Sequence, residues 1–188
     1  MKIIHPTTEF WIETKLDKPM MDYVWSQIKL AKNDVKHELV GHITKSLDLP
    51  DTENKLSLYV LEVAKKITNI YQPDMTVKTL WVNFQNKYEF NPLHLHNSAL
   101  SFVLFVQIPY KYEDESKTVQ ARNIDGPTRN GCFSFVYTSV LGRITDYDYL
   151  LNDTFEGVLL VFPSALQHQV YPFYTSDLER ISISGNIY

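Results

Sequence analysis

After Pro73 the chain becomes a series of short apolar runs separated by polar segments, and this pattern constrains the fold most strongly. The runs are rich in β-branched and aromatic residues and are short enough to be buried strands. They cover residues 77–84, 100–108, 131–141, 157–162 and 180–184. Helical patterns followed by strands predict helices packed on one face of an antiparallel sheet. Two facing sheets, as in a jelly roll, would bring distant runs together.

The residues before Pro73 have a different pattern, in which apolar side chains recur at helical spacing. The pattern predicts, in order, a strand near residues 8–16, a helix from Pro19 to Leu30, a loop with some helix over residues 32–50, and a helix over residues 53–71. A chain of 188 residues has the size of one domain. We therefore expect a single domain, in which residues 1–74 form a helical support and residues 75–188 the β core.

The charge and the cysteine count argue against several classes of function. The net charge of −4 and the pI near 5.8 speak against a broad phosphate-binding face, and so against nucleic acid as a partner. The single cysteine, Cys132, cannot form an internal disulfide, so nothing indicates an oxidising compartment. Since neither a signal-like start nor an 18-residue apolar run occurs, we expect no membrane association and a cytoplasmic location.

Two histidines, His94 and His96, stand two residues apart, so on an extended strand both point to the same side. His168 lies in a later strand-like run and could return to the same point. Three imidazole nitrogens would leave open positions on a first-row metal for a substrate and oxygen. Because no carboxylate stands two residues from His94, the site is either three histidines or is completed by a distant residue. The alternative is three unrelated histidines, because His-x-His pairs also occur by chance.

In the last run, polar and apolar residues alternate, which puts Arg180 and Ser182 on one face and Ile181 and Ile183 on the other. If the isoleucines pack under the helices, the arginine faces the histidines. A planar guanidinium can hold a carboxylate by two hydrogen bonds, and the serine hydroxyl can add a third. This arrangement would suit a keto-dicarboxylic acid with one end on the metal. The alternative is an outward, solvated arginine.

Taken together, these motifs resemble the 2-oxoglutarate- and Fe(II)-dependent oxygenases. The resemblance is greatest to a compact branch found in phages and bacteria and related to prolyl hydroxylases. It covers about residues 75–188 and rests on Trp81-Val82-Asn83, residues 91–98, Leu100-Ser101, residues 156–164, His168-Gln169-Val170 and residues 179–186. It implies a mainly β (α+β) fold, a double-stranded β-helix of the jelly-roll or cupin type, with N-terminal helices packed on one sheet.

The resemblance also implies the metal and the reaction. His94 and His168 would bind Fe(II), and His96 stands where most relatives outside this branch carry aspartate. The enzyme would use 2-oxoglutarate and O2 to hydroxylate a substrate and would release succinate and CO2. The substrate stays open between a prolyl or other protein side chain and a small molecule. If the chain is encoded by a phage, its location would be the host cytoplasm.

The co-substrate is expected to bind through the last strand. Arg180 would hold the distal carboxylate of 2-oxoglutarate, and Ser182 would assist. Asn83, Gln85 and Ser101 lie on strands near the expected pocket and could contact co-substrate or substrate; simple hydrogen bonding within the sheet is the alternative for these three.

Two other functions remain open at the level of the sequence. One is a cupin-type metal dioxygenase or isomerase that does not use 2-oxoglutarate, and the other is a non-enzymatic jelly-roll module that binds a sugar or a protein. The polar residues 112–130 are long for a loop and are expected to form a lid or substrate loop. A long aromatic edge strand could pair with a second chain, which would give a homodimer.

Overall fold

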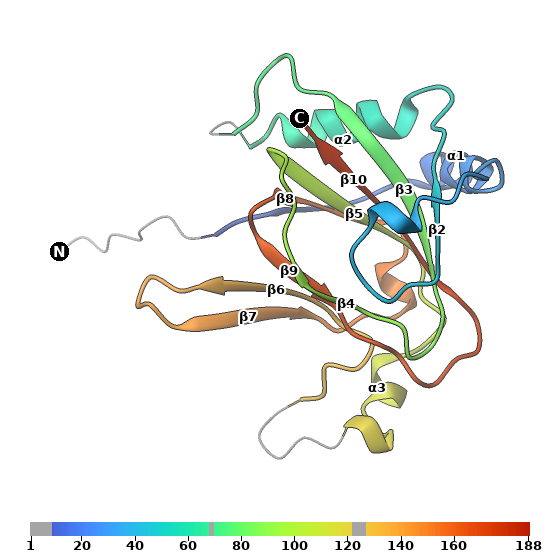
Figure 1. Ribbon diagram of the computed structural model, residues 1–188, viewed down its shortest axis with the longest axis vertical. Coiled ribbons are helices and arrows are strands. Elements are labelled where there is room, and N and C mark those ends of the chain that lie inside the picture. The colour runs from blue at the N-terminus through green and yellow to red at the C-terminus, as the bar shows by residue number, and fades with distance from the viewer. Residues whose placement is uncertain (1–8, 68–69, 122–126) are drawn as a thin grey trace.

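The computed structural model describes residues 9–67, 70–121 and 127–188, and its centre is a pair of antiparallel sheets (Figure 1). Within these residues the larger sheet has the strand order β1-β8-β5-β10-β3-β2, and the smaller sheet has the order β4-β9-β6-β7. The larger sheet contains β1 (Ile12–Lys15), β2 (Lys45–Asp48), β3 (Val77–Gln85), β5 (Leu100–Gln107), β8 (Val158–Pro163) and β10 (Arg180–Ile187). The smaller sheet contains β4 (Asn91–His94), β6 (Phe133–Thr138), β7 (Ile144–Tyr149) and β9 (Gln167–Val170).

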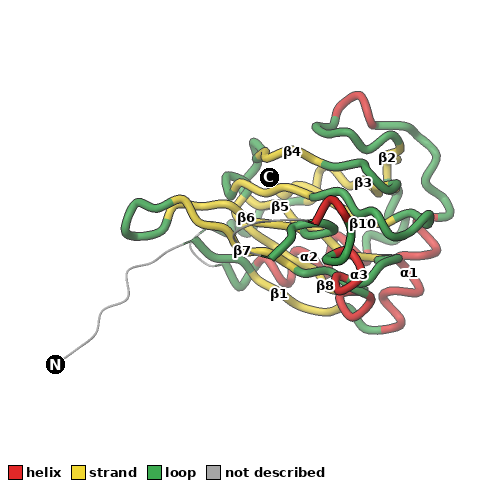
Figure 2. Tube along the Cα trace, turned by 90° about the horizontal axis from the view of Figure 1, so that it is seen from below, coloured by secondary structure: helices red, strands yellow, loops and turns green. Residues whose placement is uncertain are grey.

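The inner faces of the two sheets pack on each other through aromatic side chains. Phe162 of the larger sheet contacts Phe135 of the smaller one, with ring centroids 4.9 Å apart. Phe105 and Phe133 make a second such contact at 5.8 Å. Edge-to-face aromatic pairs of this kind stabilise a core beyond the area that they bury. The β6–β7 hairpin extends beyond the other strands (Figure 2).

The two longer helices, α1 (Lys18–Ile28) and α2 (Lys55–Ala64), cover the outer face of the larger sheet. Helix α1 begins after Asp17, whose side chain accepts a hydrogen bond from the backbone N–H of Met20 at 2.9 Å. Val24 and Val60 of the helices are fully buried in one cluster with sheet residues, which confirms the predicted packing of helices on one sheet. The remaining helical segments are α3 (Tyr112–Glu115) and short 3-10 turns at Lys36–Glu38, Val119–Ala121 and Asp153–Phe155.

Strand β10 has the alternation that its sequence predicts. Ile181 and Ile183 lie in the cluster beneath the helices, whereas Arg180, Ser182 and Ser184 line a cavity between the two sheets. The same strand therefore contributes to the core with one face and to a potential site with the other. Of the described residues, none belongs to a helix long and apolar enough to cross a membrane.

Four segments differ from the sequence-based expectation. The segment 32–50 contains the strand β2 in addition to a short 3-10 turn. The helix expected over residues 53–71 ends at Ala64, because the next backbone hydrogen bonds run to the third preceding residue instead of the fourth. Strands β4 and β7 are too short or too polar to be recognised alone, and both are fixed by pairing with neighbours.

The polar segment 112–130, which we expect to act as a lid, contains α3 and a 3-10 turn. Glu115 at the end of α3 is buried, and its carboxylate accepts hydrogen bonds from the backbone N–H groups of Tyr174 and Thr175. The start of the segment is thus anchored to the main body. Residues 122–126 of the proposed lid lie outside the described residues, as do residue 8 of the first expected strand and residues 68–69 of the second expected helix.

Candidate metal centre

The three histidines singled out in the sequence meet at one point between the sheets. Strands β4 and β9 pair with His94 opposite His168, and His96 follows two residues after His94. One ring nitrogen of each lies within 4.8 Å of the others, and the ring centroids are 4.3–5.2 Å apart. The cluster could hold one metal ion, because imidazole nitrogen is a good ligand for iron, nickel, copper and zinc.

Hydrogen bonds to the backbone fix the orientation of two of these rings. The Nδ1 atom of His94 lies 2.7 Å from the carbonyl oxygen of Pro92, and the Nδ1 atom of His168 lies 3.0 Å from that of Leu166. A carbonyl oxygen only accepts, so Nδ1 carries the proton in both rings. The lone pair is then on Nε2, which is the arrangement that metal-binding histidines generally show.

Burial keeps the three imidazoles neutral. It lowers the pKa of His168 to about 3, with a further contribution from nearby His94. It also lowers the pKa of His96 to about 4, again together with His94, and it lowers the pKa of His94 itself. A histidine binds a metal only when it is deprotonated. At neutral pH the cluster is therefore ready to accept a cation without releasing protons.

The guanidinium of Arg180 lies in the same cavity and is only 3% exposed. Its Nε and Nη2 atoms both donate to Oε1 of Gln85, and Nη2 also donates to the carbonyl oxygen of Tyr171 at 3.2 Å. Its Nη1 atom donates to the hydroxyl of Tyr110 and to the carbonyl oxygen of Gly131 at 2.9 Å. All five N–H groups of the guanidinium thus have an acceptor.

Every one of these acceptors is neutral, and the described residues include no carboxylate paired with Arg180. A buried charge without a counter-ion is costly, and an anion that enters the cavity would reduce this cost. The donor set, three neutral nitrogens for a cation and one buried guanidinium for an anion, therefore fits a metal ion bound together with an organic acid.

The cavity has a polar and an apolar part. Besides the three histidines, its polar wall consists of Ser46, Asn83, Gln85, Asn91, Arg180, Ser182 and Ser184. Its apolar wall consists of Leu39, Val40, Ile43, Trp81, Phe102, Val103, Phe105, Phe133, Phe162 and Val170. The structure thus brings the predicted residues His94, His96, His168, Arg180, Ser182, Asn83 and Gln85 to one cavity.

Ser101 is the one predicted co-substrate residue that does not line this cavity. Its hydroxyl lies 2.7 Å from the hydroxyl of Ser164 and donates to Oδ1 of Asn186 at 2.9 Å. Asn186 in turn donates to the hydroxyl of Thr79 at 3.0 Å. These bonds join strands β5, β10 and β3 within the larger sheet, so in this structure Ser101 serves the sheet.

Sequence reasoning missed Tyr110, Gly131 and Tyr171, which surround Arg180. Gly131 and Tyr171 act through backbone carbonyl oxygens, which every residue type has, so the residue type gives no signal. The Asn130-Gly131 pair is the one available signal, because such pairs mark tight turns. Gly131 has a φ of +72°, and a Cβ atom there would lie 2.6 Å from the ring of Tyr110.

Comparison with known proteins agrees with this geometry. The sequence model of a family described as putative 2OG-Fe(II) oxygenase matches residues 79–186. That range contains the three histidines and Arg180, together with β4, β9 and all of β10 except its last residue. No curated protein matches the sequence significantly.

Several solved structures share the fold at low sequence identity. A prolyl-4-hydroxylase from Pseudomonas putida aligns with a TM-score of 0.58 at 14% identity, over 95% of this chain and 91% of the other. The collagen prolyl hydroxylase of Paramecium Bursaria Chlorella virus-1, in complex with 2-oxoglutarate, gives 0.59 at 10% identity over 95% and 96%. HygX from Streptomyces hygroscopicus, with nickel, 2-oxoglutarate and hygromycin B bound, gives 0.61 at 10% identity over 96% and 83%. The expected double-stranded β-helix fold is confirmed.

Proposed function

Because the chain belongs to the putative 2OG-Fe(II) oxygenase family, we propose that it uses Fe(II), 2-oxoglutarate and O2 to hydroxylate a C–H bond of its substrate, releasing succinate and CO2. When bound, the iron would couple the decarboxylation of 2-oxoglutarate to the insertion of oxygen into the C–H bond. The protein holds the ion, orients the two organic molecules and excludes water.

One observation carries this proposal, namely that a neutral cluster of three histidines and a buried guanidinium without a carboxylate partner line the same cavity. His94, His96 and His168 would hold Fe(II) through one face and leave the other positions open. Arg180 would bind the distal carboxylate of 2-oxoglutarate, with Ser182 beside it on the same face of β10. A cupin-type enzyme that does not use 2-oxoglutarate would have no need of this buried guanidinium.

With His96 in place of a carboxylate as the third ligand, the metal site carries a different charge. Three neutral ligands leave the full +2 charge on the ion, whereas a carboxylate in place of His96 would reduce it to +1. Because the distal carboxylate of 2-oxoglutarate would pair with Arg180, the carboxylate next to the keto group would lower the charge at the ion from +2 to +1. The proposed histidine triad is therefore suited to an acidic co-substrate, in line with the guanidinium nearby.

The cavity wall also limits the substrate. With the three histidines neutral, Arg180 is the one charged side chain among the described residues of the wall. Leu39, Val40 and Ile43 give the wall an apolar segment. Once Arg180 has its carboxylate, no charged side chain of the described wall is left to pair with a charged substrate group. We therefore propose that the reacting part of the substrate is uncharged, as in a prolyl or other apolar protein side chain or a neutral portion of a small molecule.

The experiment that tests this function is the formation of succinate from 2-oxoglutarate in air with added Fe(II). Even without the native substrate, enzymes of this kind are expected to turn over the co-substrate slowly. Arg180→Leu and His168→Ala should each lower the rate at least about 100-fold, because co-substrate binding and the metal site are then lost. Formation of no succinate by the unmodified protein, despite bound iron, would favour a metal enzyme that does not use 2-oxoglutarate.

A further inference from the structure

The acceptors around Arg180 differ in how easily a ligand could replace them. The carbonyl oxygens of Gly131 and Tyr171 are fixed, because the two segments that carry them pair with each other. The N–H of Gly131 donates to the carbonyl of Pro172 at 2.8 Å, and the N–H of Tyr171 donates to that of Cys132 at 2.9 Å. These two carbonyls cannot move aside without breaking backbone hydrogen bonds.

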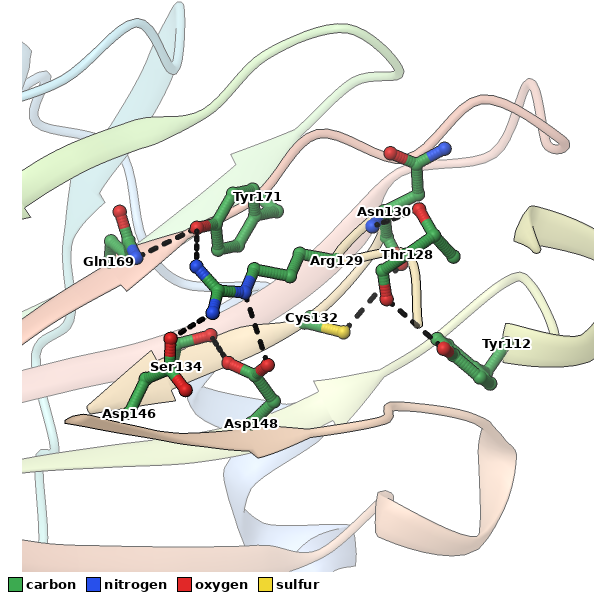
Figure 3. A network of polar contacts seen from close by, with 10 residues as sticks. All are labelled: Tyr112, Thr128, Arg129, Asn130, Cys132, Ser134, Asp146, Asp148, Gln169 and Tyr171. Carbon is green, nitrogen blue, oxygen red and sulfur yellow. Dashed lines mark hydrogen bonds and ion pairs between the residues drawn. The ribbon is translucent and has the colours of Figure 1, made fainter. Parts of the chain in front are cut away.

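A polar network on the face of β6 and β9 that points away from the cavity also holds these two segments in place (Figure 3). Arg129 forms ion pairs with Asp146 and Asp148 and donates to the hydroxyl of Tyr171 at 3.3 Å. Gln169 also donates to this hydroxyl, at 2.9 Å. Both ends of Tyr171 are thus engaged, which keeps its carbonyl in position against Arg180.

The hydroxyl of Tyr110 is fixed as well. It donates to the carbonyl of Gly131 at 2.6 Å while it accepts from Arg180. Its ring is buried and stacks on Phe173, with centroids 4.8 Å apart. Neither the ring nor the hydroxyl can leave without opening the core.

Gln85 is buried like Tyr110, but it is the one acceptor of Arg180 that lines the cavity, so a ligand can reach it. Its Oε1 atom accepts from both Nε and Nη2 of the guanidinium. These two N–H groups form the fork that binds a carboxylate in a bidentate manner. A neutral amide oxygen therefore occupies the position that a carboxylate would take. On its other side, the Nε2 atom of Gln85 donates to the carbonyl of Glu89 at 2.6 Å.

We propose that Gln85 is an internal competitor of the co-substrate: its amide oxygen holds the fork of Arg180 until the distal carboxylate of 2-oxoglutarate displaces it. This inference rests on the proposed function. A full negative charge binds a guanidinium more strongly than an amide dipole does, so a dicarboxylic acid can displace Gln85. A 2-oxo acid without the distal carboxylate cannot. Gln85 thereby lowers the affinity for 2-oxoglutarate, and with it the preference for this acid over monocarboxylic 2-oxo acids.

Two ligands distinguish competition for Arg180 from a general effect of the Gln85 substitution on the cavity. The first is 2-oxoglutarate, and the second is 2-oxopentanoate, in which a methyl group replaces the distal carboxylate. Binding of each to the Fe(II)-loaded protein is measured without oxygen by calorimetry, and thermal unfolding is recorded with and without ligand. Gln85→Ala should bind 2-oxoglutarate about fivefold to tenfold more tightly, because the internal hydrogen bonds no longer compete. Its affinity for 2-oxopentanoate should change less than about twofold.

Gln107→Ala is the matched control. Gln107 lies on β5, next to β10 on the side opposite β3, with Ile181 as its register partner. Its Nε2 atom donates to a backbone carbonyl, that of Glu179, at 2.8 Å, and its side chain does not line the cavity. The same truncation at this position should leave the affinity for both acids unchanged.

A second variant at position 85 shows whether a change in binding merely reflects a loss of folding. Gln85→Glu keeps the size of the side chain and provides a permanent carboxylate for Arg180. It should weaken binding of 2-oxoglutarate at least about tenfold and leave 2-oxopentanoate nearly unaffected. The two variants at position 85 should therefore change the affinity for the dicarboxylic acid in opposite directions.

Three results would overturn the inference. Weaker binding of 2-oxoglutarate by Gln85→Ala would mean that Gln85 contacts the ligand instead of competing with it. An equal change for both acids would mean that the effect does not involve the distal carboxylate. If the unmodified Fe(II)-loaded protein binds neither acid, the proposed function is itself wrong and the inference falls with it; in the first two cases the proposed function survives.

Discussion

Replacing Tyr110 by phenylalanine removes the hydroxyl that joins Arg180 to the backbone of Gly131. Burial raises the pKa of Tyr110 to about 12, so the phenol is neutral at pH 7 and can donate to Gly131 while it accepts from Arg180. The ring keeps its stacking contact with Phe173. The substitution therefore removes two hydrogen bonds and almost no apolar contact.

The expected cost follows from these two bonds. A hydrogen bond between neutral groups contributes about 1 kcal/mol net, and one to a charged group contributes about 1.5–3 kcal/mol. Their sum lowers the free energy of unfolding by about 2.5–4 kcal/mol. For a domain of this size, each kcal/mol shifts the melting temperature by about 2–4 °C, so Tm should fall by roughly 5–16 °C.

Urea denaturation of the metal-free protein at pH 7 measures this difference, with Tyr112→Phe as the control. The hydroxyl of Tyr112 is half-buried and makes a single bond, to the carbonyl of Thr128 at 3.0 Å. Its loss should cost about 1 kcal/mol or less. The reasoning is refuted if Tyr110→Phe destabilises the protein no more than Tyr112→Phe does.

Three further outcomes are expected. Gly185→Ala should destabilise the protein by about 1–3 kcal/mol in the same urea assay, because a Cβ atom there would lie 2.6 Å from both the ring of Phe102 and the carbonyl of Thr79; an unchanged midpoint would contradict this. The metal-free protein should lose stability as the pH falls below about 6.5, because folding depresses the pKa of His96 to about 4 and of His168 to about 3, so that the unfolded chain binds more protons in this range. Unfolding midpoints measured from pH 7 to pH 4 test this, and a flat profile would speak against it. His96→Asp should weaken 2-oxoglutarate binding severalfold in calorimetry, since the added carboxylate reduces the charge of the metal site by one unit; tighter binding would contradict the charge argument.

The sequence could predict those features that depend on the spacing of residues close together in the chain. The alternation of β10 directly assigns Ile181 and Ile183 to the core and Arg180 to the cavity, because strand side chains alternate between faces. The same rule predicts His94 and His96 on one side; β4 ends at His94, and both side chains line the cavity. The return of His168 to the same point depends on the pairing of β4 with β9, which the sequence only suggests.

The features that sequence could not predict arise from contacts between distant segments. The carbonyl oxygens of Gly131 and Tyr171 bind Arg180, but any residue type has a carbonyl oxygen. The double hydrogen bond from Arg180 to Gln85 depends on the register between β10 and β3, in which these two residues are partners. Strand β7 is rich in polar residues and is a strand because it pairs with β6 along its whole length.

The most direct test of the central claim is an anaerobic titration of the protein with Fe(II) and 2-oxoglutarate, followed by visible absorption. A weak charge-transfer band should appear only when both are present and should saturate at one equivalent of each per chain. His168→Ala should abolish the band, because one of the three proposed ligands is missing. A saturated metal site that gives no band with 2-oxoglutarate, or a band of full strength in His168→Ala, would contradict the account.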